Sequence, residues 1–216
     1  MRATINVAFA LIIVSFLIGV YLYPQMPVRM DSHWNAAGEV NGHASRFMGL
    51  FLLPIISLVL LVLLVLIPRI DPKKENIRAF RKEYDWLIFV IIAFLFYVYF
   101  LSVLWNLGAR FNFSLMLLPA FTILFLFMAF VLGKAKPNWF IGIRTPWTLS
   151  SEKVWYKTHK MGAKMFKAVA LVSLLGFIFP LRAIWFVIIP VLIVVAYLIV
   201  YSYVVYKREH VKKAAR

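Results

Sequence analysis

The most regular feature of this sequence is the alternation of long apolar segments with shorter polar and mostly basic ones. Segments of about 20 residues, at about 1.5 Å per helical residue, are long enough to cross a hydrocarbon core of about 30 Å. We therefore predict an all-α integral membrane protein with six transmembrane helices. The predicted spans are residues 4–23, 47–67, 86–107, 113–132, 161–179 and 184–206.

The composition supports this class. Hydrophobic residues make up 64% of the chain and charged residues 15%, far from the proportions of a soluble domain. The net charge of +16 would suit nucleic acid only if the basic residues formed one solvated patch, and here they are dispersed between apolar segments. We expect the lipid bilayer as a partner, no direct contact with nucleic acid, and a multi-pass protein of the cell membrane. The chain has no cysteine, which excludes disulfides and thiol chemistry, and no cofactor is expected.

Two of the six segments need further argument. The first, residues 4–23, has a signal peptide as its alternative interpretation. Its apolar run is too long for one, and Tyr21-Leu22-Tyr23-Pro24 offers no small-residue cleavage site. The fifth is the least regular, because its uninterrupted apolar part covers only residues 168–179. It can span a bilayer only if the lysines in 161–167 extend toward the headgroups.

The distribution of basic residues predicts the orientation in the membrane. Short cytoplasmic loops carry an excess of Lys and Arg. With six spans and a cytoplasmic N-terminus, the inner segments hold 20 of the 24 Lys and Arg residues. Both termini are therefore predicted to be cytoplasmic. The expected organisation is a two-span module (1–67) with an outer loop (24–46), a basic cytoplasmic loop (68–85), and a four-span module (86–216) that contains an inner segment (134–164).

The outer loop, residues 24–46, contains candidate polar chemistry. Asn41-Gly42 is a turn signal, which favours a short strand pair, and Trp34 is typical of a membrane-interface anchor. Four side chains in the loop are potential metal ligands, but their spacing matches no metal motif. We interpret them as solvated polar residues and predict no metal site. They are Asp31, His33, Glu39 and His43.

The inner segment, residues 134–164, combines a turn with a basic helix. Pro146 biases Thr145 away from the helical region, so the chain is expected to turn there. Ser150 or Ser151 is a suitable N-cap for a helix that follows. Lysines then recur at spacings of four and three beside an apolar stripe, which predicts an amphipathic cytoplasmic helix before span five, in contact with anionic lipid or a partner. The lysines are Lys153, Lys157, Lys160, Lys164 and Lys167.

Arg144 lies between apolar neighbours within this segment. Ile141, Ile143 and Trp147 surround it in sequence, and a guanidinium in such a setting seeks a carbonyl, a carboxylate or an aromatic face. We predict a packed cap on the helix bundle in preference to direct ligand contact. Membrane-interface anchoring is the alternative role for Trp139 and Trp147.

Residues 138–164, NWFIGIRTPWTLSSEKVWYKTHKMGAK, resemble the signature of the SdpI family of polytopic membrane proteins. Residues 26–54, which include His33-Trp34-Asn35 and Gly38, resemble a module of unknown function that commonly precedes that signature. The two resemblances and the six-span layout cover nearly the whole chain. The positions that carry the signature are Asn138, Gly142, Arg144, Thr145, Pro146, Trp147, Thr148, Leu149 and Trp155.

The resemblance implies immunity against a secreted, membrane-active peptide toxin. It also implies signalling in which the membrane protein holds a cytoplasmic transcriptional repressor. A transporter or channel is one alternative, although the centres of the predicted spans carry no Asp, Glu, Lys, Arg or His. A membrane enzyme that uses the outer His and Asp residues is another, although no catalytic motif accompanies them. We expect a protein that is not an enzyme.

Overall fold

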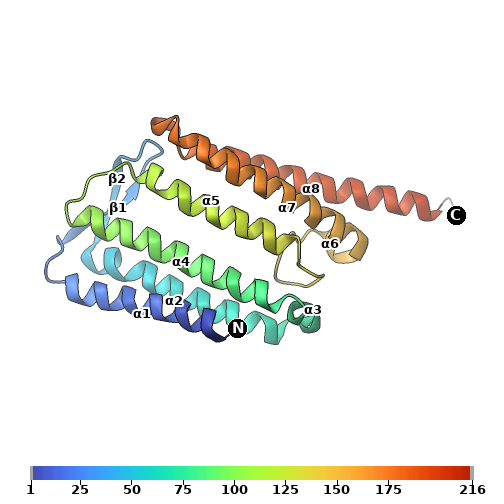
Figure 1. Ribbon diagram of the computed structural model, residues 1–216, viewed down its shortest axis with the longest axis horizontal. Helices are drawn as coiled ribbons and strands as arrows, with labels where there is room; N and C mark the ends of the chain where they lie inside the picture. Colours follow the sequence, from blue (N-terminus) through green and yellow to red (C-terminus); the bar gives the residue numbers. More distant parts are fainter. Residues whose placement is uncertain (1, 215–216) are drawn as a thin grey trace.

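The computed structural model describes residues 2–214 and is mostly helical (Figure 1). A β-hairpin follows the first helix, and two 3₁₀ turns (Leu174–Phe177 and Pro180–Arg182) precede the last one. The elements are α1 (Arg2–Leu22), β1 (Arg29–Trp34), β2 (Val40–Ser45), α2 (Arg46–Ile70), α3 (Lys74–Arg78), α4 (Arg81–Asn106), α5 (Phe113–Leu132), α6 (Pro146–Ser150), α7 (Glu152–Ser173) and α8 (Trp185–Ala214).

Five helices within the described residues are long and apolar enough to cross a membrane, namely α1, α2, α4, α5 and the Trp185–Glu209 part of α8. They correspond to five of the six predicted spans. The remaining prediction, residues 161–179, does not form such a helix: residues up to Ser173 belong to α7, and a 3₁₀ turn follows. The predicted amphipathic helix and span five are therefore one continuous helix. Its lysine-rich first half makes it too polar to qualify by composition.

Local sequence explains where these helices begin. Ser151 is the N-cap of α7, as predicted, and its hydroxyl accepts a hydrogen bond from the backbone N–H of Val154 (3.4 Å). Asn112 caps α5 in the same way, through a bond from the N–H of Leu115 (3.0 Å). Such caps satisfy backbone donors that the helix itself leaves unpaired.

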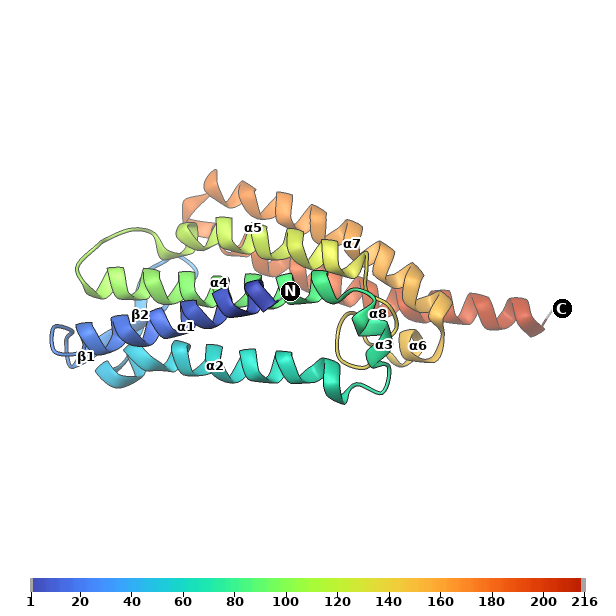
Figure 2. The same cartoon turned by 60° about the horizontal axis from the view of Figure 1, so that its bottom comes forward.

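The helices pack as two groups, α1, α2 and α4 in one and α5, α7 and α8 in the other, which meet where α4 contacts α5. Helix α4 contacts α1, α2 and α5, whereas α7 lies between α5 and α8 and contacts both (Figures 1 and 2). One buried apolar cluster includes Ile12, Leu61 and Ile88 from the first group. A second includes Leu118, Phe166 and Leu198 from α5, α7 and α8. The long helices run along one common direction, as the spans of a membrane bundle do.

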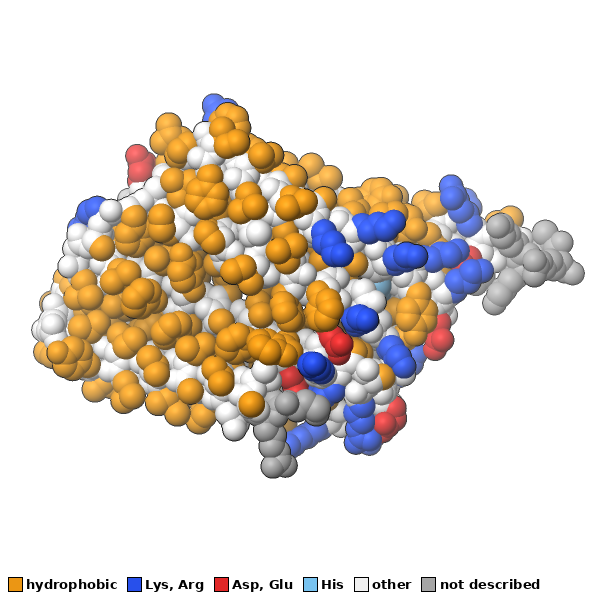
Figure 3. Space-filling model, viewed as in Figure 1, with side chains coloured by type: hydrophobic (Ala, Val, Ile, Leu, Met, Phe, Trp, Pro, Cys, Tyr) orange, Lys and Arg blue, Asp and Glu red, His pale blue; other side chains and the backbone are white. Residues whose placement is uncertain are grey.

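The surface divides into an apolar body and a basic end. In Figure 3, hydrophobic side chains cover most of the visible bundle, and Lys and Arg gather at the end where α3, α6 and the last turns of α8 lie. The β-hairpin and the α4–α5 loop lie at the opposite end (Figure 1). An apolar body of this kind suits contact with lipid, because water would strongly disfavour so large an exposed apolar surface.

The outer loop forms an antiparallel strand pair, as the sequence favoured. The turn, however, lies between Trp34 and Val40, before the predicted position at Asn41-Gly42. Asn41 and Gly42 belong to β2. Asn35 makes the turn instead: its side-chain Oδ1 accepts hydrogen bonds from the N–H groups of Ala37 (2.9 Å) and Glu39 (3.0 Å). Gly38 completes it with a φ of +85°, a conformation that glycine adopts without strain.

Candidate functional site: the inner segment and the outer hairpin

The inner segment folds over the basic end of the bundle, and Asn138 organises its first turn. The Asn138 side chain is 1% exposed. Its Oδ1 accepts hydrogen bonds from the N–H groups of Phe140 (2.9 Å) and Ile141 (2.6 Å). Its Nδ2 donates to the carbonyls of Lys136 (2.8 Å) and Ile141 (3.0 Å). One amide side chain thus replaces the regular secondary structure that this turn lacks.

Trp155 and His159 anchor the segment from α7. The indole of Trp155 is fully buried, donates from Nε1 to the Ala135 carbonyl (2.9 Å), and stacks on the His159 ring at a centroid distance of 4.0 Å. Nε2 of His159 accepts the backbone N–H of Ile143 (3.0 Å). The proton of the neutral ring therefore lies on Nδ1, 2.9 Å from the Trp155 carbonyl.

His159 is the signature-segment residue that sequence reasoning missed. Burial lowers the pKa of its imidazole to about 4, because a charged ring would lose its hydration. The ring is then neutral near pH 7 and keeps Nε2 free to accept the Ile143 N–H. The available signal was its position four residues after Trp155, which places both side chains on one helix face.

Gly142 allows the chain to pass this histidine. Its φ is +110°, and a Cβ atom built at this position would overlap Nε2 of His159. Gly162 on α7 makes similar room for Ile143, the residue that follows Gly142. A Cβ at Gly162 would lie 2.5 Å from Cδ1 of Ile143. Both glycines let the loop backbone approach α7 closely.

Thr145 caps the short helix α6, which contains Thr148, and fastens it to α8. Thr145 is extended (φ −103°, ψ 161°), as expected before Pro146, which is the first residue of α6. Each threonine side chain accepts a hydrogen bond from the backbone N–H of the other, at 2.9 and 3.2 Å. The Thr145 hydroxyl also donates to Oγ of Ser202 on α8 (3.0 Å). Trp147 packs its ring 5.1 Å from that of Tyr203, also on α8.

Asp71 connects the segment to the first half of the chain. This carboxylate follows α2, is 2% exposed, and accepts hydrogen bonds from the N–H groups of Lys73 (2.6 Å) and Trp139 (2.9 Å). Asn76 adds a second link by donating to the Pro137 carbonyl (2.7 Å). Neither residue was recognised from the sequence, because a polar residue in a basic loop is ordinarily solvated.

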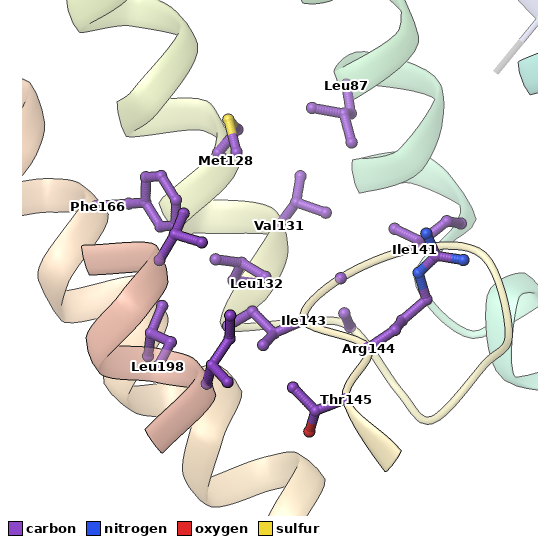
Figure 4. Close-up of a pocket in the computed structure, with 14 residues that line it drawn as sticks. Leu87, Met128, Val131, Leu132, Ile141, Ile143, Arg144, Thr145, Phe166 and Leu198 are labelled. Atoms are coloured by element: carbon purple, nitrogen blue, oxygen red, sulfur yellow. The ribbon is translucent and has the colours of Figure 1, made fainter. Parts of the chain in front are cut away.

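Arg144 lies exposed on the loop, and its Nη1 donates to the Trp139 carbonyl (2.7 Å). It stands at the edge of a cavity of about 360 Å³ (Figure 4). Met128, Val131 and Leu132 of α5 face this space, and Leu198 of α8 and Phe166 of α7 complete the apolar wall.

The lysine stripe lies exposed on α7, but two of its five lysines have a partner within the chain. Lys157 and Lys153 contact the carboxylate of Glu209 on α8 at 3.0 and 3.4 Å. Lys160 and Lys164 form no ion pair with a described residue. Exposed pairs of this type contribute only about 0–1 kcal/mol to stability, so the stripe remains available to an anionic surface.

At the opposite end, Asp31 holds the hairpin against α4. Its carboxylate contacts Nδ1 of His43 (2.8 Å) and accepts the indole N–H of Trp105 (2.8 Å). The side-chain amide of Asn106 pairs with the backbone N–H and carbonyl of Asp31, each at 2.9 Å. The free edge of β1 is thereby covered at this residue.

The potential metal ligands of the hairpin are not gathered in one place. His33 contacts Oδ1 of Asn41 (2.5 Å), and Glu39 accepts from Nδ2 of Asn35 (3.0 Å). Among the described residues, no group of three or more His, Cys, Asp or Glu side chains has the arrangement of a metal site.

Trp34 closes a second cavity, of about 330 Å³, between the hairpin, α4, α5 and α8. Its ring stacks on Phe113 at a centroid distance of 3.8 Å and meets Trp105 edge-on at 5.7 Å. The Nε1–H of Trp34 is buried and has no hydrogen-bond acceptor among the described residues. His33 and Asn35 also line this cavity.

The apolar bundle and its two folded ends define a multi-pass helical membrane protein. Comparison with known sequences finds two family models that match parts of the chain. Residues 134–202 match the SdpI/YfhL protein family, and residues 10–58 match a domain of unknown function, DUF1648. These matches show an SdpI/YfhL region preceded by a DUF1648 region, and they confirm the resemblance seen in the signature residues.

A distant relative extends the similarity over almost the full length. The chain is 24% identical over 203 residues to the immunity protein SdpI of Bacillus subtilis (strain 168), which covers 94% of this chain and 95% of that protein. No solved structure matches the chain significantly. Neither match is to a known enzyme family.

Proposed function

We propose that this protein protects the cell that makes it against a secreted, membrane-active peptide. The observation that carries the proposal is the near full-length similarity to an immunity protein, which spans both the outer hairpin and the inner segment. The cavity beside Trp34 supports an outer contact with the peptide, since a buried indole N–H favours a ligand that supplies a carbonyl acceptor. The basic inner end suits a cytoplasmic partner such as the repressor that the family resemblance implies.

The proposal includes a topology of six crossings with both termini in the cytoplasm. Helix α7 runs alongside α5 and α8 (Figure 2), which supports a sixth crossing made by its apolar last turns and the following 3₁₀ turn. Lys160, Lys164 and Lys167 would extend from α7 toward the headgroups. The basic end then faces the cytoplasm, as the positive-inside rule requires.

Single cysteines test this topology directly, because the natural chain contains none. Ala109→Cys and Leu181→Cys are expected to react with a membrane-impermeant maleimide in intact cells. Ala79→Cys and Ser150→Cys should react only after permeabilisation. All four positions are exposed. Leu181 is decisive: labelling there only after permeabilisation would mean that α7 does not cross the membrane.

Protection is tested in toxin-sensitive cells that produce the protein and are challenged with the killing peptide of the family. We expect the wild type to preserve survival and membrane potential, and Arg144→Ala to reduce both to the level of cells without the protein. Arg78→Ala is the matched control, since Arg78 is an exposed arginine at the same end of the bundle whose one ion pair with a described residue is to Glu75. Wild-type protein that inserts normally and gives no protection would refute the proposed function.

A further inference from the structure

The cavity beside Arg144 opens toward the membrane. Val195 and Ile199 line it from α8 and are 44% and 46% exposed, respectively. Met128 and Val131 line it from α5. The cavity therefore lies between two membrane-facing helices, near the basic end of the bundle, with the inner segment as its floor (Figure 4).

The lining specifies an occupant that is apolar along most of its length. Apart from the loop residues Gly142, Arg144 and Thr145, all side chains that line the cavity are hydrophobic. The Thr145 hydroxyl is already engaged by Ser202. An apolar chain buried here would gain about 25 cal/mol for each Å² of surface that it covers.

The edge of the cavity, where Arg144 lies, favours an occupant with a negative charge at one end. Arg144 forms no ion pair with a described residue. Among the described residues, only Nη1 of its guanidinium has an acceptor, the Trp139 carbonyl. A guanidinium retains further donors in a planar fork that fits a phosphate group. Lys134 and Lys136, both exposed, add positive charge in the same loop.

We propose that this cavity binds one acyl chain of an anionic phospholipid, whose phosphate contacts Arg144. The lipid comes from the leaflet at the basic end of the bundle, where basic side chains attract anionic headgroups. The acyl chain fills the space between α5 and α8 below the inner segment. This site is separate from the lysine stripe of α7, because none of those lysines lines the cavity.

The test uses full-length protein reconstituted in nanodiscs of phosphatidylcholine with 20% phosphatidylglycerol. Lipids that remain bound after gentle extraction are counted by native mass spectrometry. Arg144→Gln removes the phosphate contact, and Met128→Trp fills the cavity. The matched controls are Arg78→Gln, at the same end of the bundle, and Leu126→Trp, a membrane-facing residue of α5 that is 43% exposed.

We expect wild type and both controls to retain one phosphatidylglycerol in preference to phosphatidylcholine. Arg144→Gln should weaken retention about fivefold, the contribution of about one basic side chain at an anionic surface, and Met128→Trp should abolish it. Equal retention of both lipids by the wild type, or unchanged retention in either variant, would overturn the proposal. Normal retention by Met128→Trp together with lost toxin protection would assign the cavity to the peptide instead.

Discussion

Alanine in place of Gly142 is expected to release the inner segment from α7 and to lower the free energy of unfolding by about 2–5 kcal/mol. Two effects add. The φ of +110° at this position strains any residue that has a Cβ. The new methyl group would also overlap Nε2 of His159, so His159 and Ile143 would have to separate and leave a buried N–H and a buried ring nitrogen unpaired.

Gly108→Ala has the first effect alone, so the difference between the two variants gives the second. Gly108 has nearly the same backbone conformation (φ +104°), but a Cβ built there meets no atom within 4 Å. Its replacement should cost only the backbone strain, about 1–2 kcal/mol. Unfolding free energies from SDS titration in mixed micelles measure both variants, and trypsin cleavage after Lys134 reports release of the loop. Equal losses for the two variants would show that contact with His159 contributes nothing.

The membrane-spanning part of the fold could be predicted because it depends on local composition. Five predicted spans correspond to helices that meet the requirements of length and apolarity, since a helix in lipid is specified by its own run of apolar residues. Residues 161–179 were harder to assign, because α7 combines lysines on one face with buried Val154 and Phe166 on another. Composition alone does not show that such a helix packs between α5 and α8.

The site was predicted where the chain is locally restricted and missed where distant residues meet. Pro146 determined the extended conformation of Thr145, and the capping preference of serine determined the start of α7 at Ser151. By contrast, the roles of His159 and Asp71 depend on partners 16 and 68 positions away in the sequence. No spacing rule relates such positions within one chain.

Asp71 is the clearest case of a residue that is placed against local preference. A carboxylate just after the C-terminus of a helix meets the negative end of the helix dipole, which costs free energy. It is also 2% exposed and forms no ion pair with a described residue. Hydrogen bonds from the N–H groups of Lys73 and Trp139 compensate for that cost. Asp71 therefore joins the helices of the DUF1648 region to the inner segment of the SdpI/YfhL region.

Asp71→Asn should break this junction with little change in shape. The amide can accept with one oxygen, whereas its NH₂ group would face a backbone N–H, so one buried donor loses its partner at a cost of about 1–3 kcal/mol. Glu75→Gln is the matched control: it removes the same charge from an exposed surface pair and should cost less than about 0.5 kcal/mol.

Hydrogen exchange measured by mass spectrometry separates loosening of the junction from general instability. In Asp71→Asn, peptides that cover residues 134–145 should exchange faster than in the wild type, whereas peptides from the outer hairpin should not change, because Asp31 and Asn106 hold that end independently. Faster exchange at both ends would mean that the two halves unfold as one unit. Unchanged exchange at both ends would mean that the bond from Trp139 to Asp71 does not hold the inner segment, and Asn76, which donates to Pro137, would then be the main link between the halves.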